Sequence, residues 1–244
     1  MVLLSRRRNW VLIMALAFVQ GVQGSSASDP YTLPAFSSSV TAGNLIVVAV
    51  VGDNGSIDST TNITDNKSGN SYQRADSTLN FGNGTNLNMD IWFGQVTNGG
   101  SSFALTIAFN SMVQNGRFVA QEFSGFSSTA TLDKFAKANA TSTSPSSGAT
   151  GTTSVADELI VGLIARAGNN SSTISLGSGY SNLTNTATTA AAGMESKVVS
   201  STGTQTATFS LSVSRAWLCA VLAFQDGSGG GGGGGNTTNF FNLL

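Results

Sequence analysis

The segment Phe103-Ala-Leu-Thr-Ile-Ala-Phe109 alternates large apolar side chains with small or hydroxyl-bearing ones. Because successive side chains of a β-strand point to opposite faces, this period of two predicts a strand with one buried face and one wet face. The segment Ala207-Thr-Phe-Ser-Leu-Ser-Val213 has the same pattern. Both segments are typical of half-buried strands in antiparallel sheets.

Three further apolar segments have no polar face, namely Leu45–Val51, Leu159–Ala165 and Trp217–Phe224. Such runs are typical of central strands that are covered on both sides. Between residues 28 and 226 no apolar period of 3.6 residues is sustained, and Asn-Gly and Ser-Gly pairs supply turn residues. We therefore predict an all-β protein, an antiparallel β-sandwich or jelly roll of roughly twelve strands.

Five pairs of segments recur in the same order, which indicates an internal repeat. The pairs are Asn44–Val47 with Glu158–Val161, Gly69–Tyr72 with Gly177–Tyr180, Met89-Asp90 with Met194-Glu195, Phe103–Phe109 with Thr206–Ser212, and Arg117–Phe123 with Arg215–Val221. Loop deletions in the second half would explain why their offset shrinks along the chain. We interpret the pairs as two pseudo-symmetric halves of five strands each. The alternative is that β-rich sequences of low complexity match one another by chance.

Several motifs occur together in an order that is similar to a known family. They are Val40–Leu45, Thr64-Asp65 with Gly69–Tyr72, Glu122–Gly125, Ala156–Leu159, Ser201–Gly203 and a closing strand through Phe224. With them, residues 15–226 resemble an uncharacterised, jelly-roll-like β-sandwich family of environmental bacterial and phage surface proteins. The resemblance implies a surface setting and an opening strand at Ala15–Gln20, and it brings no catalytic residues.

The composition excludes several classes of function. The chain has no histidine and one cysteine, which excludes a Ser-His-Asp triad, a Cys-His pair, a histidine metal site and an internal disulfide. Only 9% of the residues are charged, and three of the eleven basic residues are Arg6–Arg8. Because no basic stripe remains for phosphate contacts, we expect no nucleic-acid binding. We also expect no enzyme activity.

The N-terminus has two interpretations. Arg6–Arg8, the apolar run Trp10–Val19 and a small residue at Gly24 are typical of a secretory signal within residues 1–24. The apolar run is too short to span a bilayer, so we expect no membrane span in the mature chain. In the second interpretation Ala15–Gln20 is the first strand of the domain, and Met14 is an alternative start.

The domain organisation follows from these segments. Residues 1–14 are a leader or an N-terminal extension, and residues 15–226 form the β-sandwich domain. Residues 227–235, eight glycines and one serine, form a flexible linker that reaches about 15–18 Å on average. Residues 236–244 form an apolar terminal peptide that we expect to dock on a neighbouring subunit; its candidate contact residues are Phe240, Phe241, Leu243 and Leu244.

Two ligand sites are candidates. Asp53, Asp58 and Asp65 offer the oxygen ligands that Ca²⁺ prefers, and no other cofactor is expected. The alternative is that these side chains bond their own backbone in turns. Tyr72 and Trp92, with the neighbouring Phe93, lie near polar loops and are candidates for stacking on a sugar ring. The alternative is that Trp92 fills the sandwich core.

The remaining reactive side chains have structural interpretations. Glu122 is the strongest of the carboxylates that could support glycoside hydrolysis. We expect it instead to pair with an arginine such as Arg117 or Arg215, or to accept hydrogen bonds from loop amides. Cys219 lies in the same apolar run as Trp217 and is expected to be a buried, unreactive thiol.

Together the patterns favour a non-enzymatic structural or adhesive β-sandwich protein. We expect it on a virion or an extracellular surface, where it would assemble with itself or with other surface proteins. The alternative is a secreted carbohydrate-binding module, assisted by calcium, whose partner is a glycan.

Overall fold

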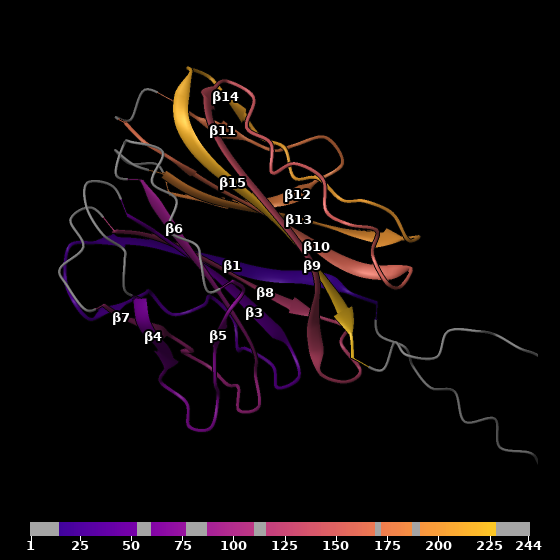
Figure 1. Cartoon of the computed structure of the whole chain (residues 1–244). Coiled ribbons are helices and arrows are strands. Elements are labelled where there is room, and N and C mark those ends of the chain that lie inside the picture. Colours follow the sequence, from indigo (N-terminus) through magenta and orange to yellow (C-terminus); the bar gives the residue numbers. More distant parts are fainter. Residues whose placement is uncertain are drawn as a thin grey trace, which may run out of the picture.

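The structure of the chain is a computed structural model that describes residues 15–52, 60–76, 87–109, 116–168, 172–186 and 191–227 (Figure 1). These residues form antiparallel strands and no helix, as the sequence predicts, so none of them belongs to an apolar helix that could cross a bilayer. The strands are β1 (Ala17–Ser26), β2 (Tyr31–Thr32), β3 (Leu45–Gly52), β4 (Thr60–Asp65), β5 (Gln73–Arg74), β6 (Asn88–Gln95), β7 (Leu105–Phe109), β8 (Gly116–Ser124), β9 (Ala130–Ser142), β10 (Asp157–Arg166), β11 (Ile174–Ser175), β12 (Ser181–Asn185), β13 (Ala191–Ser200), β14 (Ser210–Leu211) and β15 (Arg215–Asp226).

The described residues contain more strands than the expected number of roughly twelve. The difference lies in short strands, because β2, β5, β11 and β14 have only two residues each. A strand of two residues is too short to show an apolar period of its own. Of these four short strands, only β14 lies within a segment that the sequence predicts as a strand, Ala207–Val213.

Two five-stranded sheets form the body of the molecule. Their strand orders are β1-β8-β3-β6-β5 and β12-β13-β10-β15-β9. In Figure 1 strands β1, β3, β6 and β8 of the first half, coloured indigo to magenta, lie in one layer, and the orange and yellow strands β12, β13 and β15 lie in the other. A three-stranded sheet, β2-β7-β4, accompanies the first large sheet, and the pair β11-β14 accompanies the second.

The two large sheets have the same strand order when β1, β8, β3, β6 and β5 are matched with β9, β15, β10, β13 and β12. This correspondence is the one that the repeated segments predict. The strand pairing corrects one match, because Leu45 pairs with Phe123 whereas Leu159 pairs with Phe224. Phe123 therefore corresponds to Phe224 and not to Val221. The sequence match is out by three residues because apolar strands resemble one another in several registers.

Three apolar cores explain the predicted central strands. The central core lies between the two large sheets and contains alternate residues of β3, namely Leu45, Val47, Ala49 and Val51. The first core, under the sheet β2-β7-β4, contains the intervening residues Ile46, Val48 and Val50. The second core lies under the pair β11-β14 and includes Ile160 and Cys219. Because β3 and β10 are covered on both faces, their sequences have no polar face.

The alternating segments behave as predicted over most of their length. Leu105, Ile107 and Phe109 of β7 are buried, and the residues between them are partly exposed. In the second half Ala207, Phe209 and Leu211 are buried in the same way. The pattern ends before Val213, which is 42% exposed. Only Ser210–Leu211 of this segment is a strand, so the apolar period extends beyond the strand itself.

The N-terminal strand pairs with β8 along its length, from Ala17 opposite Ser124 to Ser26 opposite Gly116. This is the position that the strand interpretation of the N-terminus predicts. Cleavage of a leader near Gly24 would remove most of β1 and leave the outer edge of β8 unpaired. Residues 1–14 lie outside the described residues.

The two halves meet differently at the two long edges of the central core. Where β1 approaches β12, a Cβ on Gly21 would lie 2.2 Å from Thr184 Oγ1, so only glycine allows this close approach. The buried Gln121 of β8 donates hydrogen bonds to Asn182 O, Thr184 Oγ1 and Met194 O on the same side. At the opposite edge the halves are joined by more exposed contacts, including an ion pair between β9 and the residues that follow β5.

Candidate functional site

The candidate side chains Tyr72 and Trp92 make their contacts inside the first half. Trp92 on β6 is 7% exposed and lies in the first core, and the Arg74 guanidinium stands 5.1 Å from the centre of its ring. The Tyr72 hydroxyl donates a hydrogen bond to Asp65 Oδ2 at 2.7 Å. Burial, together with this bond and the charge of Asp65, raises the pKa of Tyr72 far above its ordinary value. Trp92 therefore fills the first core. Tyr72 packs against the same core, and its hydroxyl group is held by Asp65.

Of the three calcium candidates, only Asp65 lies within the described residues. Its Oδ1 accepts a hydrogen bond from the Lys67 backbone N–H at 2.7 Å, and its Oδ2 accepts the bond from Tyr72. Oδ1 therefore stabilises the turn at residues 65–67, and Oδ2 holds the Tyr72 ring. No group of three His, Cys, Asp or Glu side chains in the described ranges is placed to hold a metal ion. Several predicted residues lie outside these ranges, namely Asp53, Asp58, Phe240, Phe241, Leu243 and Leu244.

Glu122 on β8 is a fully buried carboxylate that amide groups surround. Its Oε2 accepts a hydrogen bond from Gln20 Nε2 at 2.6 Å. Its Oε1 accepts bonds from Asn44 Nδ2 at 2.6 Å and from the Thr41 backbone N–H at 3.0 Å. Arg117 is five positions away on the same strand, so its side chain leaves the opposite face of the sheet. Of the two structural interpretations of Glu122, the amide bonds are therefore the one observed, with three neutral donors around the carboxyl group.

Glu195 on β13 is equally buried, in the second core, but it has fewer partners. Its Oε2 accepts a bond from the Gly177 N–H at 2.8 Å, whereas Oε1 has no hydrogen-bond partner among the described residues. Gly162 makes room for it, since a Cβ there would lie 2.9 Å from Oε1. Burial raises the pKa of Glu195 to about 7, despite the Gly177 bond and the charge of Lys197.

The only cysteine of the chain lies in this same second core. Cys219 is fully buried, and burial raises the pKa of its thiol well above the ordinary value, with a further contribution from Glu195. A buried thiol that is kept protonated is a poor nucleophile. Cys219 therefore behaves as the small apolar side chain that the sequence predicts.

A second pair of carboxyl groups lies where β9 has a bulge opposite β15. Asp133 at the bulge accepts hydrogen bonds from the Ser154 N–H at 2.7 Å and from Lys134 Nζ at 2.8 Å. Burial opposes ionisation of Asp133, but these bonds lower its pKa. Burial, and then the nearby Asp133, raise the pKa of Glu158 to about 7. Because Glu158 is fully buried, its proton is shielded from any ligand in solvent.

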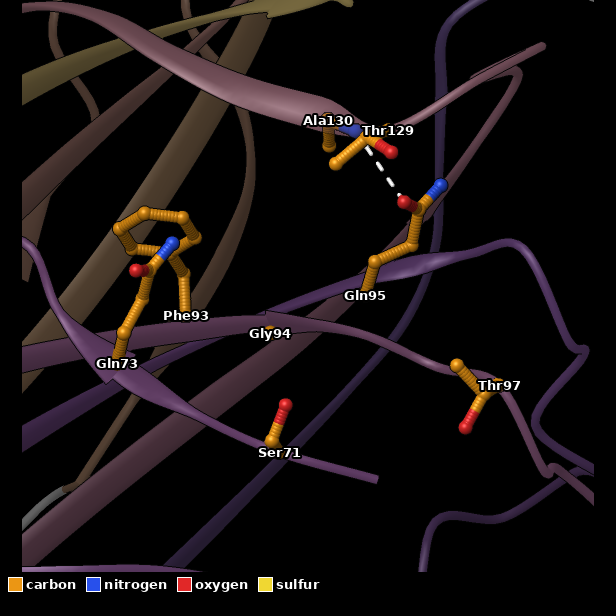
Figure 2. Close-up of a pocket in the computed structure, with 8 residues that line it drawn as sticks. All are labelled: Ser71, Gln73, Phe93, Gly94, Gln95, Thr97, Thr129 and Ala130. Carbon is orange, nitrogen blue, oxygen red and sulfur yellow. Dashed lines mark hydrogen bonds between the residues drawn. The ribbon is translucent and has the colours of Figure 1, made fainter. Parts of the chain in front are cut away.

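The described surface is hollowed at the edge where β5 and β6 approach the start of β9 (Figure 2). The hollow has a volume of about 340 Å³. Phe93, 5% exposed, contributes its ring from the central core, where it packs against Phe224. The other lining residues are Ser71, Gln73, Gly94, Gln95, Thr97, Thr129 and Ala130.

The side chains around this hollow fall into two groups. Gln95 is fixed, because its Nε2 donates to Gly43 O and Ser128 O and its Oε1 accepts from the Ala130 N–H, the bond drawn in Figure 2. Thr97 is fixed by a bond from its hydroxyl to a backbone carbonyl. By contrast, the side chains of Ser71, Gln73 and Thr129 make no hydrogen bonds to described residues. These three groups can therefore bind a polar ligand.

Of the residues that line this hollow, sequence reasoning names only Phe93 as a candidate, and the sequence contains no local signal for the others. Gln73 and Gln95 belong to neighbouring strands of the first half, whereas Thr129 precedes the first strand of the second half. Glutamine and threonine are common on polar surfaces of this chain, so their residue types attract no attention. Only the packing of the two halves brings them together.

The hollow is thus a neutral, partly preformed polar site, and the carboxyl groups that could do acid-base chemistry are buried away from it. Comparisons of the chain with protein-family models, curated proteins and solved structures found no match.

Proposed function

We propose that this chain is a non-enzymatic structural or adhesive protein, displayed on a virion or an extracellular surface. One observation carries the proposal. The two halves share the central core between their large sheets and so form a single block, in which the reactive side chains are used internally. Glu122 binds three donors, and Cys219 and Glu158 are fully buried. A rigid block of this kind suits a building or display role.

The charge of the chain supports a surface role. Only 9% of its residues are charged and its net charge is −1, so the exterior depends on hydroxyl and amide groups for its solubility. A neutral surface of this kind exerts little long-range attraction on nucleic acids. The resemblance to phage and bacterial surface proteins points to the same setting.

The end of the last strand supports a mechanical role for the tail. Asp226 accepts hydrogen bonds from the backbone N–H groups of Ser127 and Ser128, at 2.7 Å and 2.9 Å. The Gly227 N–H donates to Thr129 O at 2.7 Å. The linker therefore starts from a fixed point on β15, which lies between β10 and β9 in the second large sheet. A force on the tail would pass into the sheet.

The proposal is tested by the assembly state of the full chain, measured by light scattering over a range of concentrations. We expect complexes of several copies, which the double variant Phe240→Ser, Phe241→Ser converts to monomers because it removes the apolar docking side chains. The matched control is Thr237→Ala, Thr238→Ala, which changes the same tail without changing its apolar residues. A full chain that stays monomeric at every concentration, or that hydrolyses a polysaccharide, would contradict the proposal.

The alternative function, a secreted carbohydrate-binding module, is supported by the hollow between β6 and β9. It draws no support from Tyr72 and Trp92, because the Tyr72 hydroxyl is bonded to Asp65 and the Trp92 ring is buried in the first core.

A further inference from the structure

We infer that the hollow between β6 and the start of β9 binds one residue of a neutral sugar. This inference deepens the adhesive part of the proposed function and rests on it, because it names the ligand class through which the protein would adhere. The site is defined by the free side chains of Ser71, Gln73 and Thr129 around the edge of Phe93.

The size and lining of the hollow fit such a ligand. Its volume of about 340 Å³ lies at the lower end of the range for small-molecule sites, roughly 300–1,000 Å³. Two hydroxyl groups and one carboxamide can each donate and accept hydrogen bonds. A sugar ring presents hydroxyl groups that do the same. These three side chains therefore match the alternating donors and acceptors of a sugar better than they match a purely apolar ligand.

The walls of the hollow are held in place before any ligand arrives. Two of the three hydrogen bonds of Gln95 connect the first half to residues 128 and 130 of the second. On the other wall, Asn70 Oδ1 accepts bonds from the backbone N–H groups of Thr97 and Asn98. A Cβ on Gly94 would lie 2.4 Å from Ser71 O, so glycine keeps these two segments close. A preformed site loses less conformational entropy on binding.

The charges near the hollow favour a neutral ligand. None of the residues that line it is charged. Lys137 pairs with Asp76 at 2.9 Å, and Arg74 pairs with Asp90 at 3.1 Å. Arg74 follows Gln73 on β5, so the two side chains leave opposite faces of the strand. An acidic sugar would therefore find no cation within the site.

The hollow is a specific feature of one edge of the molecule. At the matching edge of the pseudo-symmetric pair, where β1 approaches β12, Gly21 and Thr184 are in close contact and Gln121 bonds across the halves. The same arrangement of strands thus gives a closed edge and an open one. The open edge is not a necessary result of packing two sandwiches together.

The chain's own tail is the competing occupant, because Gly227 bonds to Thr129 and residues 228–244 therefore start beside the hollow. The apolar surface available there is small, since Phe93 is only 5% exposed. A phenylalanine from the tail would leave the free hydroxyl and amide groups without partners, which is costly. The lining therefore favours a sugar over the terminal peptide.

The test is a titration of the full chain, followed by NMR, with methyl glucoside, methyl galactoside, methyl mannoside and N-acetylglucosamine. Sialic acid and glucuronic acid are the acidic comparisons. We expect at least one neutral sugar to bind with a Kd on the order of millimolar, typical of a single small polar ligand. We expect Gln73→Ala and Thr129→Val each to weaken it about fivefold, the effect of one lost hydrogen bond. The matched control Gln23→Ala, on the exposed surface of β1, should leave binding unchanged.

Three results would overturn the inference. One is that no neutral sugar binds the full chain, and another is that binding is insensitive to both hollow variants although their spectra show a folded protein. The third is that a synthetic peptide of residues 236–244 displaces the sugar from the hollow, which would assign the hollow to the tail. Light scattering on the same variants separates this inference from the proposed function. Sugar binding without assembly would contradict only the structural role, and assembly without sugar binding only the ligand.

Discussion

The two halves of the molecule treat a buried glutamate in opposite ways. Glu122 in the first half and Glu195 in the second are both fully buried on inner strands of a five-stranded sheet. Glu122 accepts hydrogen bonds from three donors, whereas Glu195 accepts one and has a second oxygen without a partner among the described residues. Similar backbones thus surround one carboxyl group with donors and leave the other with a single hydrogen bond. For Glu195, burial with so few donors favours the protonated form.

The burial of Glu195 with one hydrogen bond predicts a stability that depends on pH. The pKa of Glu195 in the folded protein, about 7, is higher than its unfolded value of about 4.3. A folded-state pKa that is raised means that the folded protein binds the proton more tightly. Its contribution to stability is therefore fully present below about pH 4 and is lost as the pH rises through 7. The pKa of Glu158, also in the second half, is likewise raised, so its contribution to stability is lost in the same direction of pH.

The largest expected effect comes from Glu122→Gln. An amide NH₂ group in place of one carboxylate oxygen would face the N–H donors of Gln20, or of Asn44 and Thr41, and leave them buried without an acceptor. We expect the free energy of unfolding to fall by about 3 kcal/mol at pH 7. Urea denaturation measures it. An unchanged midpoint would mean that the donors around Glu122 contribute nothing to stability, and the comparison between the halves would fail.

The second-largest expected effect is a gain in the free energy of unfolding, not a loss. Glu195→Gln removes an ionisable group that destabilises the folded state at high pH, so we expect the variant to be more stable by about 2–3 kcal/mol at pH 8. At pH 4 the two proteins should have similar stability, because both side chains are then neutral. Thermal unfolding from pH 4 to 8 checks this, and Glu122→Gln serves as the matched control. A variant that is less stable at pH 8 would show that Glu195 is ionised and satisfied.

The smallest expected effect comes from Asp226, a carboxylate of the second half that accepts hydrogen bonds from several donors. It tests whether the number of donors, and not the half of the molecule, sets the behaviour of a carboxyl group. Asp226 binds the hydroxyl and backbone N–H groups of Ser127 and Ser128, and these bonds lower its pKa to about 2 although burial acts against them. Its contribution to stability is present above about pH 4 and is lost as the pH falls towards 2.

We therefore expect Asp226→Asn to lower the free energy of unfolding by about 1 kcal/mol at pH 7, after allowing for solvent screening. Most of the loss should disappear at pH 2, because the pH then lies well below the unfolded pKa of Asp226 and close to its folded pKa of about 2. Urea titrations at the two pH values measure the difference. An equal loss at both would mean that the carboxylate charge is irrelevant at this position, and that the donor count does not set the behaviour of these groups.

Sequence patterns anticipate the fold better than they anticipate the sites. The period of two at Phe103–Phe109 and the fully apolar run Leu45–Val51 correctly predict a half-buried and a central strand. The repeat correctly matches strands of the first half with strands of the second, such as β3 with β10 and β6 with β13, but it misplaces one register by three residues. The candidate sites were chosen by residue type, and Trp92 and Asp65 proved to be used inside the first half.

The sequence by itself determined that this protein is built of antiparallel strands in two similar halves. That information is local, since side-chain periodicity and turn residues lie within a few positions of one another. Only the tertiary structure decided which carboxyl groups keep their charge and where a ligand can bind. Gln20 and Glu122 are 102 positions apart, and the hollow joins β5 and β6 to the start of β9. Hydrogen bonds of buried groups depend on which distant segments become neighbours, and no local pattern records that.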